Sequence, residues 1–175
     1  PVGCYTLRMP GSVEVPQGTV RDLVASFGDA FARQGFQAVV VLNGHGGPGH
    51  NAALEEACRK VSRKHGIRMN YPLGRVLTDV MKGKLVDRIA HHLGRALTDE
   101  EKHELAHDYH AGRMETSLAL DHHPQLVKGD PRELPPVEHS MIGMMRYWWG
   151  DLVGRGPGYM GFPHKADPAL GRALE

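Results

Sequence analysis

The sequence predicts an α/β fold in which parallel strands are joined by crossover helices. Three features support this class: an amphipathic helix pattern, a β-branched run without polar alternation, and a second helix pattern that leads into an alternating run. Their order along the chain is helix, strand, glycine-rich loop, helix, strand, which is typical of such sheets. A length of 175 residues with 41% hydrophobic residues predicts one folded domain, residues 1–175.

The first helix is predicted from Thr19 to Gln34. Thr19 and Asp22 resemble a capping pair, and Gly35 suits the position just past the helix end. Apolar residues recur at helical spacing and form one stripe, which consists of Val20, Leu23, Val24, Phe27 and Phe31.

Two strands and a second helix follow. The run from Phe36 to Leu42 has no polar alternation, so we expect a strand that is buried on both faces. After a glycine-rich loop, Asn51 is predicted to cap a helix that runs to His65. Gly66 ends that helix, and the alternating run from Ile67 to Tyr71 predicts the next strand.

The second half of the chain is predicted to be mainly helical. Apolar spacing from Val80 to Leu93 suggests one helix, weakened by Gly83. Thr98 begins a capping-box pattern for a helix that ends near His107, and another helix is predicted to begin between Glu115 and Leu120. Four glycines and three prolines between residues 154 and 168 predict a loop.

Charge and cysteine content exclude several classes of partner. The formal net charge is only +1, so we expect no nucleic-acid partner and no anionic membrane partner. The longest fully apolar stretch, Ala38 to Leu42, is far shorter than a membrane span requires. Two cysteines, Cys4 and Cys58, form no disulfide framework, which favours a reducing, cytoplasmic location.

The first candidate site is the loop from Asn43 to Asn51. His45 lies just beyond the predicted Phe36–Leu42 strand, and parallel sheets bind ligands at the carboxyl ends of their strands. The loop glycines permit positive φ and leave the His45 ring open to a ligand. A phosphate-binding loop is one alternative, but the G-x-x-x-x-G-K-[ST] pattern is absent. The other alternative is a surface turn in which His45 has no role.

The second candidate site lies between Asp108 and Ser117. His110 and Glu115 flank Gly112, and Glu115 falls in the first turn of a predicted helix, where the helix dipole favours a carboxylate. An ionised carboxylate near an imidazole suits metal binding or acid–base catalysis. Ordinary helix capping by Glu115, with His110 as a hydrogen-bonded loop residue, is the alternative.

A third pattern is His103-Glu104-Leu105-Ala106-His107, which matches H-E-x-x-H. On a helix this pattern places two imidazoles on one face, where they can bind zinc. A zinc peptidase is therefore an alternative function, with Glu115 as the third ligand. The helix from Asp99 to His107 argues against it, because only Leu105 and Ala106 offer apolar contacts that would hold it in a core.

Trp148 is a candidate for lining a substrate pocket. It lies in the aromatic run Tyr147-Trp148-Trp149. Such runs are also typical of a core or a subunit interface, so both interpretations stay open.

Several motifs occur in a characteristic order along the whole chain. They are Gly11 to Thr19 before the first helix, Gly35-Phe36 before the valine-rich run, Asn43-Gly44-His45-Gly46-Gly47, His110-Ala111-Gly112-x-x-Glu115-Thr116-Ser117, and Gly158-Tyr159-Met160-Gly161-x-Pro163. This series resembles the creatininase (creatinine amidohydrolase) family.

The resemblance implies a three-layer α/β/α fold with a mostly parallel central sheet that holds two divalent metal ions, zinc, manganese or iron. It also implies hydrolysis of a C–N bond in a small cyclic or linear amide, and a homo-oligomer. His45 and Glu115 match metal ligands of the family, and His110 matches the histidine that moves a proton. Asn43 and Gly44 would shape the loop around His45.

The chain departs from the family pattern in two places. Family members open with a strand and a Glu-x-His-Gly-x-His-Leu-Pro-x-x-Thr-Asp segment that supplies metal ligands, and no such segment precedes Pro1. We therefore expect a fragment that lacks the N-terminal strand and metal-binding segment and is nearly inactive alone. Pro48-Gly49-His50 replaces a single asparagine, which makes His50 an extra ligand, a substrate contact or part of a helix-capping turn.

A third function is compatible with the histidine content. The chain contains 12 histidines, so a non-catalytic relative that binds metal ions without hydrolysis remains an alternative to the metal-dependent amidohydrolase.

Overall fold

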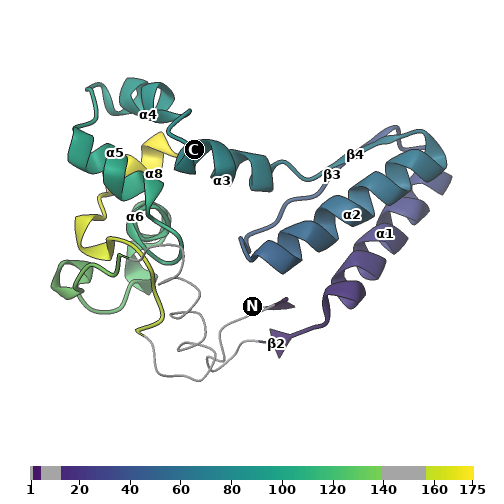
Figure 1. The fold of residues 1–175 in the computed structure, drawn as a ribbon, viewed down its shortest axis with the longest axis horizontal. Helices are drawn as coiled ribbons and strands as arrows, with labels where there is room; N and C mark the ends of the chain where they lie inside the picture. Colours follow the sequence, from purple (N-terminus) through teal and green to yellow (C-terminus); the bar gives the residue numbers. More distant parts are fainter. Residues whose placement is uncertain (1, 5–12, 139–156) are drawn as a thin grey trace. The chain divides into compact units, whose positions relative to one another are not determined.

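The computed structural model describes residues 2–4, 13–138 and 157–175 (Figure 1). Contacts within it divide the chain into two compact units, Pro1–Leu77 and Thr78–Glu175. Single-domain organisation stays a prediction. Among the described residues, no helix is both long enough and apolar enough to cross a lipid bilayer.

The first unit combines two helices with two pairs of parallel strands. Its elements are β1 (Val2–Gly3), β2 (Val13–Glu14), α1 (Gln17–Arg33), β3 (Ala38–Val40), α2 (Pro48–His65) and β4 (Arg68–Asn70). β1 pairs with β2, and β3 pairs with β4, in both cases in parallel. The α/β class with parallel strands is therefore confirmed, and α2 is the crossover helix between β3 and β4.

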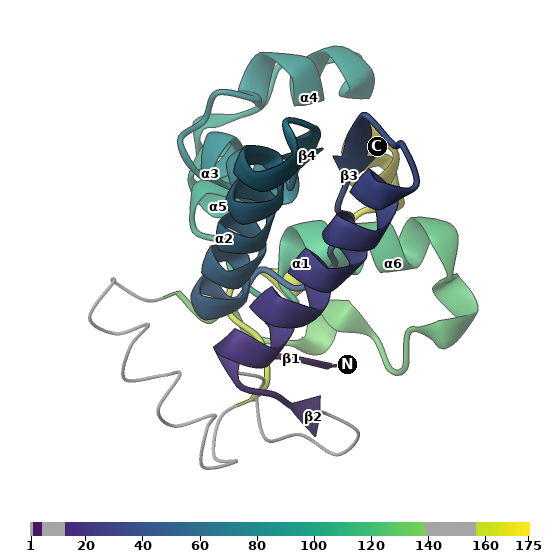
Figure 2. The ribbon, with the colours of Figure 1, turned by 90° about the vertical axis from the view of Figure 1, so that its right-hand side faces the viewer.

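The core of the first unit lies where α1 and α2 pack side by side, as Figures 1 and 2 both show. The α2 side contributes Ala53, Ala57 and Val61, whose side chains have no exposed surface. Gly28 of α1 lets the two helices approach closely, because a Cβ at this position would lie 2.9 Å from a methyl group of Val61 and 2.5 Å from the sulfur of Met69.

The prediction that the strand after α1 is buried on both faces is wrong. β3 is shorter than the predicted Phe36–Leu42 run, and Val40 and Leu42 are 59% and 88% exposed. Val39 and Val41 pack against the core of the unit, while Val40, which points to the opposite face, is exposed. A continuous apolar run does not show how many of its faces are covered.

Two helix starts also differ from prediction. α1 begins at Gln17 with Pro16 as its N-cap, so Thr19 lies inside the helix and does not cap it. α2 begins at Pro48 and not after Asn51, because proline at the first helical position already has the required φ and needs no N–H partner. Gly35 follows α1 with φ of 92°, as predicted.

The α1 stripe is only partly buried. Val20 is buried, but Leu23, Phe27 and Phe31 are 56%, 56% and 38% exposed. α1 contacts α2 through smaller residues that include Ala25, since small side chains allow close approach of the helix axes.

The second unit is helical. Beyond the boundary helix α3 (Leu73–Met81), it contains α4 (Val86–Leu93), α5 (Asp99–Ala106), α6 (Arg113–His122), three short 3₁₀ turns and α8 (Pro168–Ala173). Its core joins α4, α5 and α8 through Ile89, Leu97, Leu105, Leu170 and Ala173. The loop prediction for the C-terminal segment is confirmed over the described residues from 157 onward, apart from the 3₁₀ turn Pro163–Lys165.

The predicted Val80–Leu93 helix is two helices. Gly83 adopts φ of 69° between α3 and α4, and this left-handed conformation ends the first helix. The predicted capping box of α5 is confirmed: Thr98 accepts from the Glu101 N–H, and the Glu101 carboxylate accepts from the Thr98 N–H.

The close α1–α2 contact gives a stability prediction. We expect Gly28→Ala to destabilise the protein by about 1–3 kcal/mol, because the added methyl group overpacks against Val61. Gly18→Ala, in the same helix, is the matched control: its Cβ would meet only the flexible Arg21 tip at 3.8 Å. That variant should gain about 0.5–1 kcal/mol. Chemical denaturation measures the free energy of unfolding of both variants. Equal stability of the two would contradict the close packing of Gly28 against Val61.

Candidate functional site

The His45 loop is shaped by the side chain of Asn43. The Asn43 amide nitrogen donates to the His45 carbonyl at 2.6 Å, and the Asn43 amide oxygen accepts from the His45 N–H at 3.2 Å. Asn43 thus brackets the His45 backbone from both sides. This is the role that the family resemblance assigned to Asn43.

The His45 ring is held at one nitrogen. Its Nε2 lies 3.1 Å from the Cys4 carbonyl oxygen, so Nε2 donates, and in the neutral ring Nδ1 carries the lone pair. His45 is half-buried. Gly47 permits this packing, since a Cβ there would lie 2.6 Å from His45 Nε2.

His50 is buried beside His45. The two ring centroids are 5.1 Å apart at an interplanar angle of 73°, and His50 Nδ1 accepts from the Cys4 N–H at 3.4 Å. Burial lowers the pKa of His50, and the nearby His45 lowers it further. His50 is therefore neutral at physiological pH, and it supports the His45 loop through Cys4.

A hydrogen-bond chain fixes the loop to α2. The Tyr71 hydroxyl donates to the Asn51 amide oxygen at 2.8 Å, and the Asn51 amide nitrogen donates to the Gly46 carbonyl at 3.1 Å. A Cβ at Gly44 would meet no described atom within 4 Å. Protein packing among the described residues therefore leaves the space beside Gly44 open.

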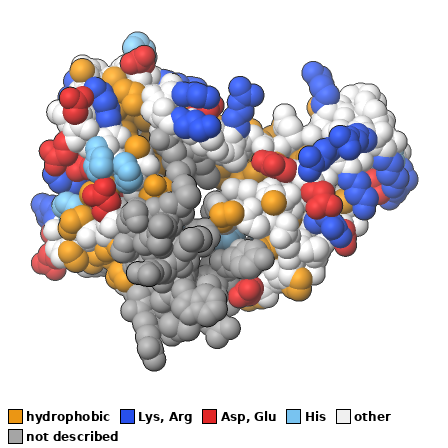
Figure 3. Space-filling view, viewed as in Figure 1, with side chains coloured by type: hydrophobic (Ala, Val, Ile, Leu, Met, Phe, Trp, Pro, Cys, Tyr) orange, Lys and Arg blue, Asp and Glu red, His pale blue; other side chains and the backbone are white. Residues whose placement is uncertain are grey.

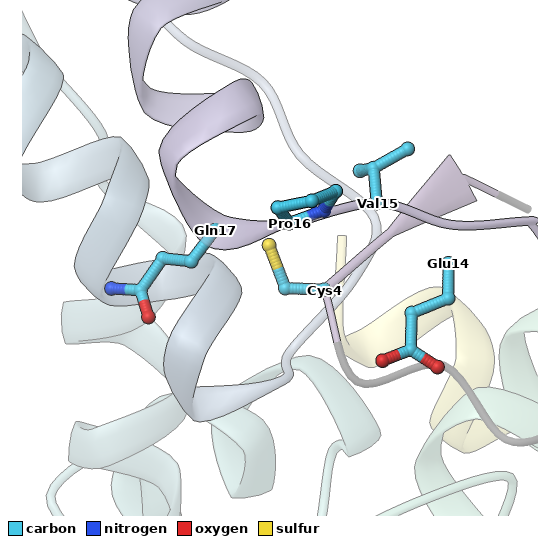
Figure 4. A pocket seen from close by; sticks show the side chains of 5 residues that line it. All are labelled: Cys4, Glu14, Val15, Pro16 and Gln17. Atoms are coloured by element: carbon cyan, nitrogen blue, oxygen red, sulfur yellow. The ribbon is translucent and has the colours of Figure 1, made fainter.

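A pocket lies next to Cys4 rather than at His45 (Figure 4). Its volume is about 360 Å³, and it is lined by Cys4, Glu14, Val15, Pro16 and Gln17. Burial raises the pKa of the Cys4 thiol, which disfavours a reactive thiolate. Cys4 therefore acts here through its backbone, which contacts both histidines.

In the second unit, His110 is fixed by the returning C-terminal segment. His110 and Met160 form an antiparallel bridge, in which the Met160 N–H donates to His110 at 2.7 Å and the His110 N–H donates back at 3.0 Å. Met160 is buried, while 44% of the His110 side chain is exposed. The backbone is thus held rigidly and the imidazole faces solvent.

Asp108 joins the His110 loop to the start of α6. Its buried carboxylate accepts from the N–H groups of Arg113 at 2.6 Å and Met114 at 2.7 Å, and from Phe162 at 3.3 Å. The first two N–H groups lie in the first turn of α6, where backbone N–H groups have no acceptor within the helix. Burial raises the pKa of the Asp108 carboxyl, and these backbone N–H groups act against that rise. Gly112 provides the space, since a Cβ there would overlap the carboxylate.

Glu115 folds back over the loop that carries His110. Its carboxylate accepts from the Ala111 N–H and lies 3.9 Å from His110 Nδ1. Ala111 has φ of 45°, and among the described residues it is the single non-glycine residue with positive φ. This conformation costs an alanine energy and commonly marks functional sites. It brings the predicted His110 and Glu115 together.

The two residues after Glu115 anchor two different segments. The Thr116 hydroxyl donates to the Ala111 carbonyl at 3.3 Å, and the buried Ser117 hydroxyl accepts from the Asp167 N–H at 2.9 Å. Asp167 in turn caps α8 by accepting from Ala169. Glu115 and Thr116 therefore both hold Ala111 of the His110 loop, while Ser117 holds the start of α8.

The roles predicted for a zinc peptidase do not fit the structure. His103 and His107 come together with Glu138, and not with Glu115. Glu104, which would act as the base of such an enzyme, is only 3% exposed and pairs with the buried guanidinium of Arg113. A helix places neighbouring residues on different faces, so Glu104 points into the unit.

The donor atoms around His45 and Glu115 suit divalent metal ions. Metal-binding histidines usually donate their second ring N–H to a carbonyl or carboxylate, as His45 does to Cys4. Glu115 keeps one carboxylate oxygen outside its hydrogen bond to Ala111 and is 58% exposed. Imidazole and carboxylate ligands accept zinc, manganese and iron.

Comparison with known proteins places the chain in a family. The family model described as creatininase, creatinine amidohydrolase, matches residues 1–175. The chain belongs to the creatininase family. A search of curated proteins gives no match. The resemblance predicted from the sequence motifs is thereby confirmed.

Solved creatininase structures share the fold. A tryptophan-to-phenylalanine creatininase variant is 18% identical with a TM-score of 0.52, and it aligns over 95% of this chain and 62% of its own. A glutamate-to-glutamine creatininase variant in complex with creatine is 19% identical with a TM-score of 0.54, over 98% of this chain and 64% of its own. The chain thus spans less than two thirds of their length, and the creatininase-like fold class is confirmed.

Two residues that position the site carry little signal in the sequence. Asp108 caps α6 from five residues before Arg113, a spacing outside ordinary N-cap patterns. Gly161 has φ of 137° and contacts the Asp108 carboxylate, and its one signal is the glycine-rich end of the chain. Trp148 lies outside the described residues, so its predicted role stays a prediction.

The Glu101 network predicts a pH-dependent contribution to stability. Hydrogen bonds from Arg95, the Thr98 N–H and Arg113 hold the pKa of the Glu101 carboxyl far below its usual value of 4.5. Ionised Glu101 therefore stabilises the folded state above pH 4.5, and this contribution is lost as the pH falls below it.

We expect Glu101→Gln to lower the free energy of unfolding by about 1–3 kcal/mol at pH 7. The difference from the unsubstituted protein should shrink in urea melts as the pH falls below 4.5. Glu100→Gln is the control, because Glu100 is 70% exposed and its pair with Lys165 is solvated. A difference for Glu101→Gln that does not change with pH would contradict stabilisation by the ionised carboxylate.

Proposed function

We propose that the protein is a metal-dependent amidohydrolase that hydrolyses a C–N bond of a small cyclic or linear amide. The observation that carries this proposal is the contact between the exposed His110 imidazole and the Glu115 carboxylate at the start of α6, in a chain that belongs to the creatininase family. The backbone around both residues is fixed while their side chains face solvent, which suits a site that receives a substrate.

The roles of the residues follow from their surroundings. We propose His45 and Glu115 as ligands of divalent metal ions, two in number and of zinc, manganese or iron. Such ions lower the pKa of water and polarise a carbonyl group. Glu115 also accepts from the Ala111 N–H, which orients its carboxylate before any ligand binds.

His110 is proposed as the group that moves a proton to the departing nitrogen. Its Nδ1 faces the Glu115 carboxylate at 3.9 Å, and an exposed imidazole is a common group for moving a proton to or from a substrate. Asn43 holds the His45 loop, and the open space beside Gly44 allows a small substrate to approach the backbone. His50 supports the loop, and Trp148 is proposed to contact the substrate.

The location and assembly of the protein are also proposals. Cys4 and Cys58 are both free thiols and both buried, which supports a reducing, cytoplasmic compartment. A homo-oligomer is implied by the family, and light scattering after size-exclusion chromatography measures it.

The proton-transfer role of His110 predicts a specific kinetic loss. His110→Ala should lower kcat by about 10²- to 10⁴-fold while the metal content of the protein stays unchanged. The assay is turnover of a panel of cyclic amides, including creatinine, and linear formamides with added zinc or manganese. His91→Ala, an exposed histidine on α4, is the control. Full turnover by His110→Ala would remove His110 from the mechanism.

The proposed roles of His45 and Glu115 as metal ligands predict a loss of bound metal. His45→Ala and Glu115→Gln should each release bound metal, as elemental analysis of dialysed protein measures, and should lower turnover in parallel. Circular dichroism checks that both variants fold. If metal binds normally and no amide is hydrolysed across the panel, the non-catalytic metal-binding relative is the correct interpretation.

A further inference from the structure

In addition to the proposed ligands His45 and Glu115, three side chains of types that bind metal ions come together in the second unit. Single ligand atoms of His103, His107 and Glu138 all lie within 4.8 Å of one another. All three residues are exposed or half-buried. Figure 3 shows histidine side chains beside an acidic one on the surface of the helical unit.

The two histidines are placed by the helix that carries them. A spacing of four residues puts His103 and His107 on one face at the end of α5. Their ring centroids are 4.2 Å apart with an interplanar angle of 33°. The buried Phe162 packs edge-on against the His103 ring at a centroid distance of 6.4 Å, which restricts where that ring can turn.

Glu138 is placed by a different part of the chain. The residue before it, Val137, forms an antiparallel bridge with Gly161, with both N–H···O distances 2.9 Å. This bridge brings the Glu138 carboxylate to 2.7 Å from His103 Nε2. The carboxylate therefore reaches the histidine pair from a segment that is itself fixed to the backbone.

The tautomer of His107 is also fixed. Its Nδ1 lies 2.8 Å from the His103 carbonyl oxygen, so Nδ1 donates, and in the neutral ring Nε2 carries the lone pair. Metal-binding histidines typically donate their other ring N–H to such a carbonyl. This hydrogen bond thus leaves Nε2 as the ligand atom of His107.

We propose that His103, His107 and Glu138 bind one divalent transition-metal ion, such as Zn²⁺, Co²⁺ or Ni²⁺. Two imidazoles and a carboxylate are a common zinc ligand set, and a tetrahedral ion with bonds of about 2.0–2.1 Å requires donor atoms about 3.4 Å apart. The three donors lie within 4.8 Å of one another, so changes in their separations of about 1.4 Å or less bring them to that spacing.

This site is separate from the proposed amidohydrolase function and does not rest on it. It also does not make the chain a peptidase, because the carboxylate of Glu104 is turned away and paired with Arg113. The ion instead joins α5 to the segment around Val137. We expect it to stabilise the second unit, since a ligand that binds only the folded state raises stability.

The test compares Co²⁺ binding by the whole protein and by the double variant His103→Ala/His107→Ala. We expect the variant to bind one ion fewer per chain in equilibrium dialysis, and to lose the rise in melting temperature that Co²⁺ causes. The matched control is His91→Ala/His92→Ala, an exposed histidine pair on α4. Both comparisons are repeated in a His45→Ala background, so that metal bound at the proposed catalytic ligands is counted separately.

Two single substitutions sharpen the assignment. Glu138→Gln should weaken Co²⁺ binding by about 10-fold or more. Even the loss of a group that only hydrogen-bonds a metal ligand lowers metal affinity by about this much. His122→Ala should leave Co²⁺ binding at this site unchanged, although His122 belongs to a second group of possible metal ligands, with Asp121 and Glu175. An unchanged ion count in His103→Ala/His107→Ala, or an equal loss in His91→Ala/His92→Ala or His122→Ala, would overturn the proposal.

Discussion

The buried carboxylate of Asp108 is the contact on which the second unit's candidate site depends. It satisfies two N–H donors of the α6 N-terminus, which otherwise would lose their hydrogen bonds in a buried position. A third bond, from Phe162, fixes the C-terminal segment to the same carboxylate. That segment then pairs with His110 through Met160. One buried carboxyl group therefore sets the place of a loop, a helix and a bridging segment that comes from the far end of the chain.

Two histidines, His45 and His107, are oriented by backbone carbonyl groups. The Cys4 carbonyl accepts a hydrogen bond from His45 Nε2, and the His103 carbonyl accepts one from His107 Nδ1. In the neutral ring the second nitrogen then carries the lone pair, which is the form that binds a metal ion. Backbone carbonyls serve this purpose well, because they are fixed by secondary structure and do not titrate. His103 and His110 differ, since their rings face the carboxylates of Glu138 and Glu115.

Sequence patterns predicted local structure better than they predicted burial. The parallel strands, the Thr98 capping box and the His110–Glu115 pairing followed from residue types at short spacing. The exposure of Val40 could not follow, because it depends on which other segments cover the sheet. The role of Asp108 was hidden for a related reason: its partners include Phe162, and no pattern in one sequence shows a contact over that separation.

The H-E-x-x-H pattern shows how the same five residues can support one chemistry and exclude another. The helix brings His103 and His107 onto one face, so the pattern correctly indicates metal-ligating geometry. Peptidase chemistry needs in addition a glutamate that faces the ion, and Glu104 instead forms a buried ion pair with Arg113. Leaving Arg113 buried without that partner would be costly. Glu104 therefore stays buried and paired with Arg113. The carboxylate next to the two histidines is that of Glu138.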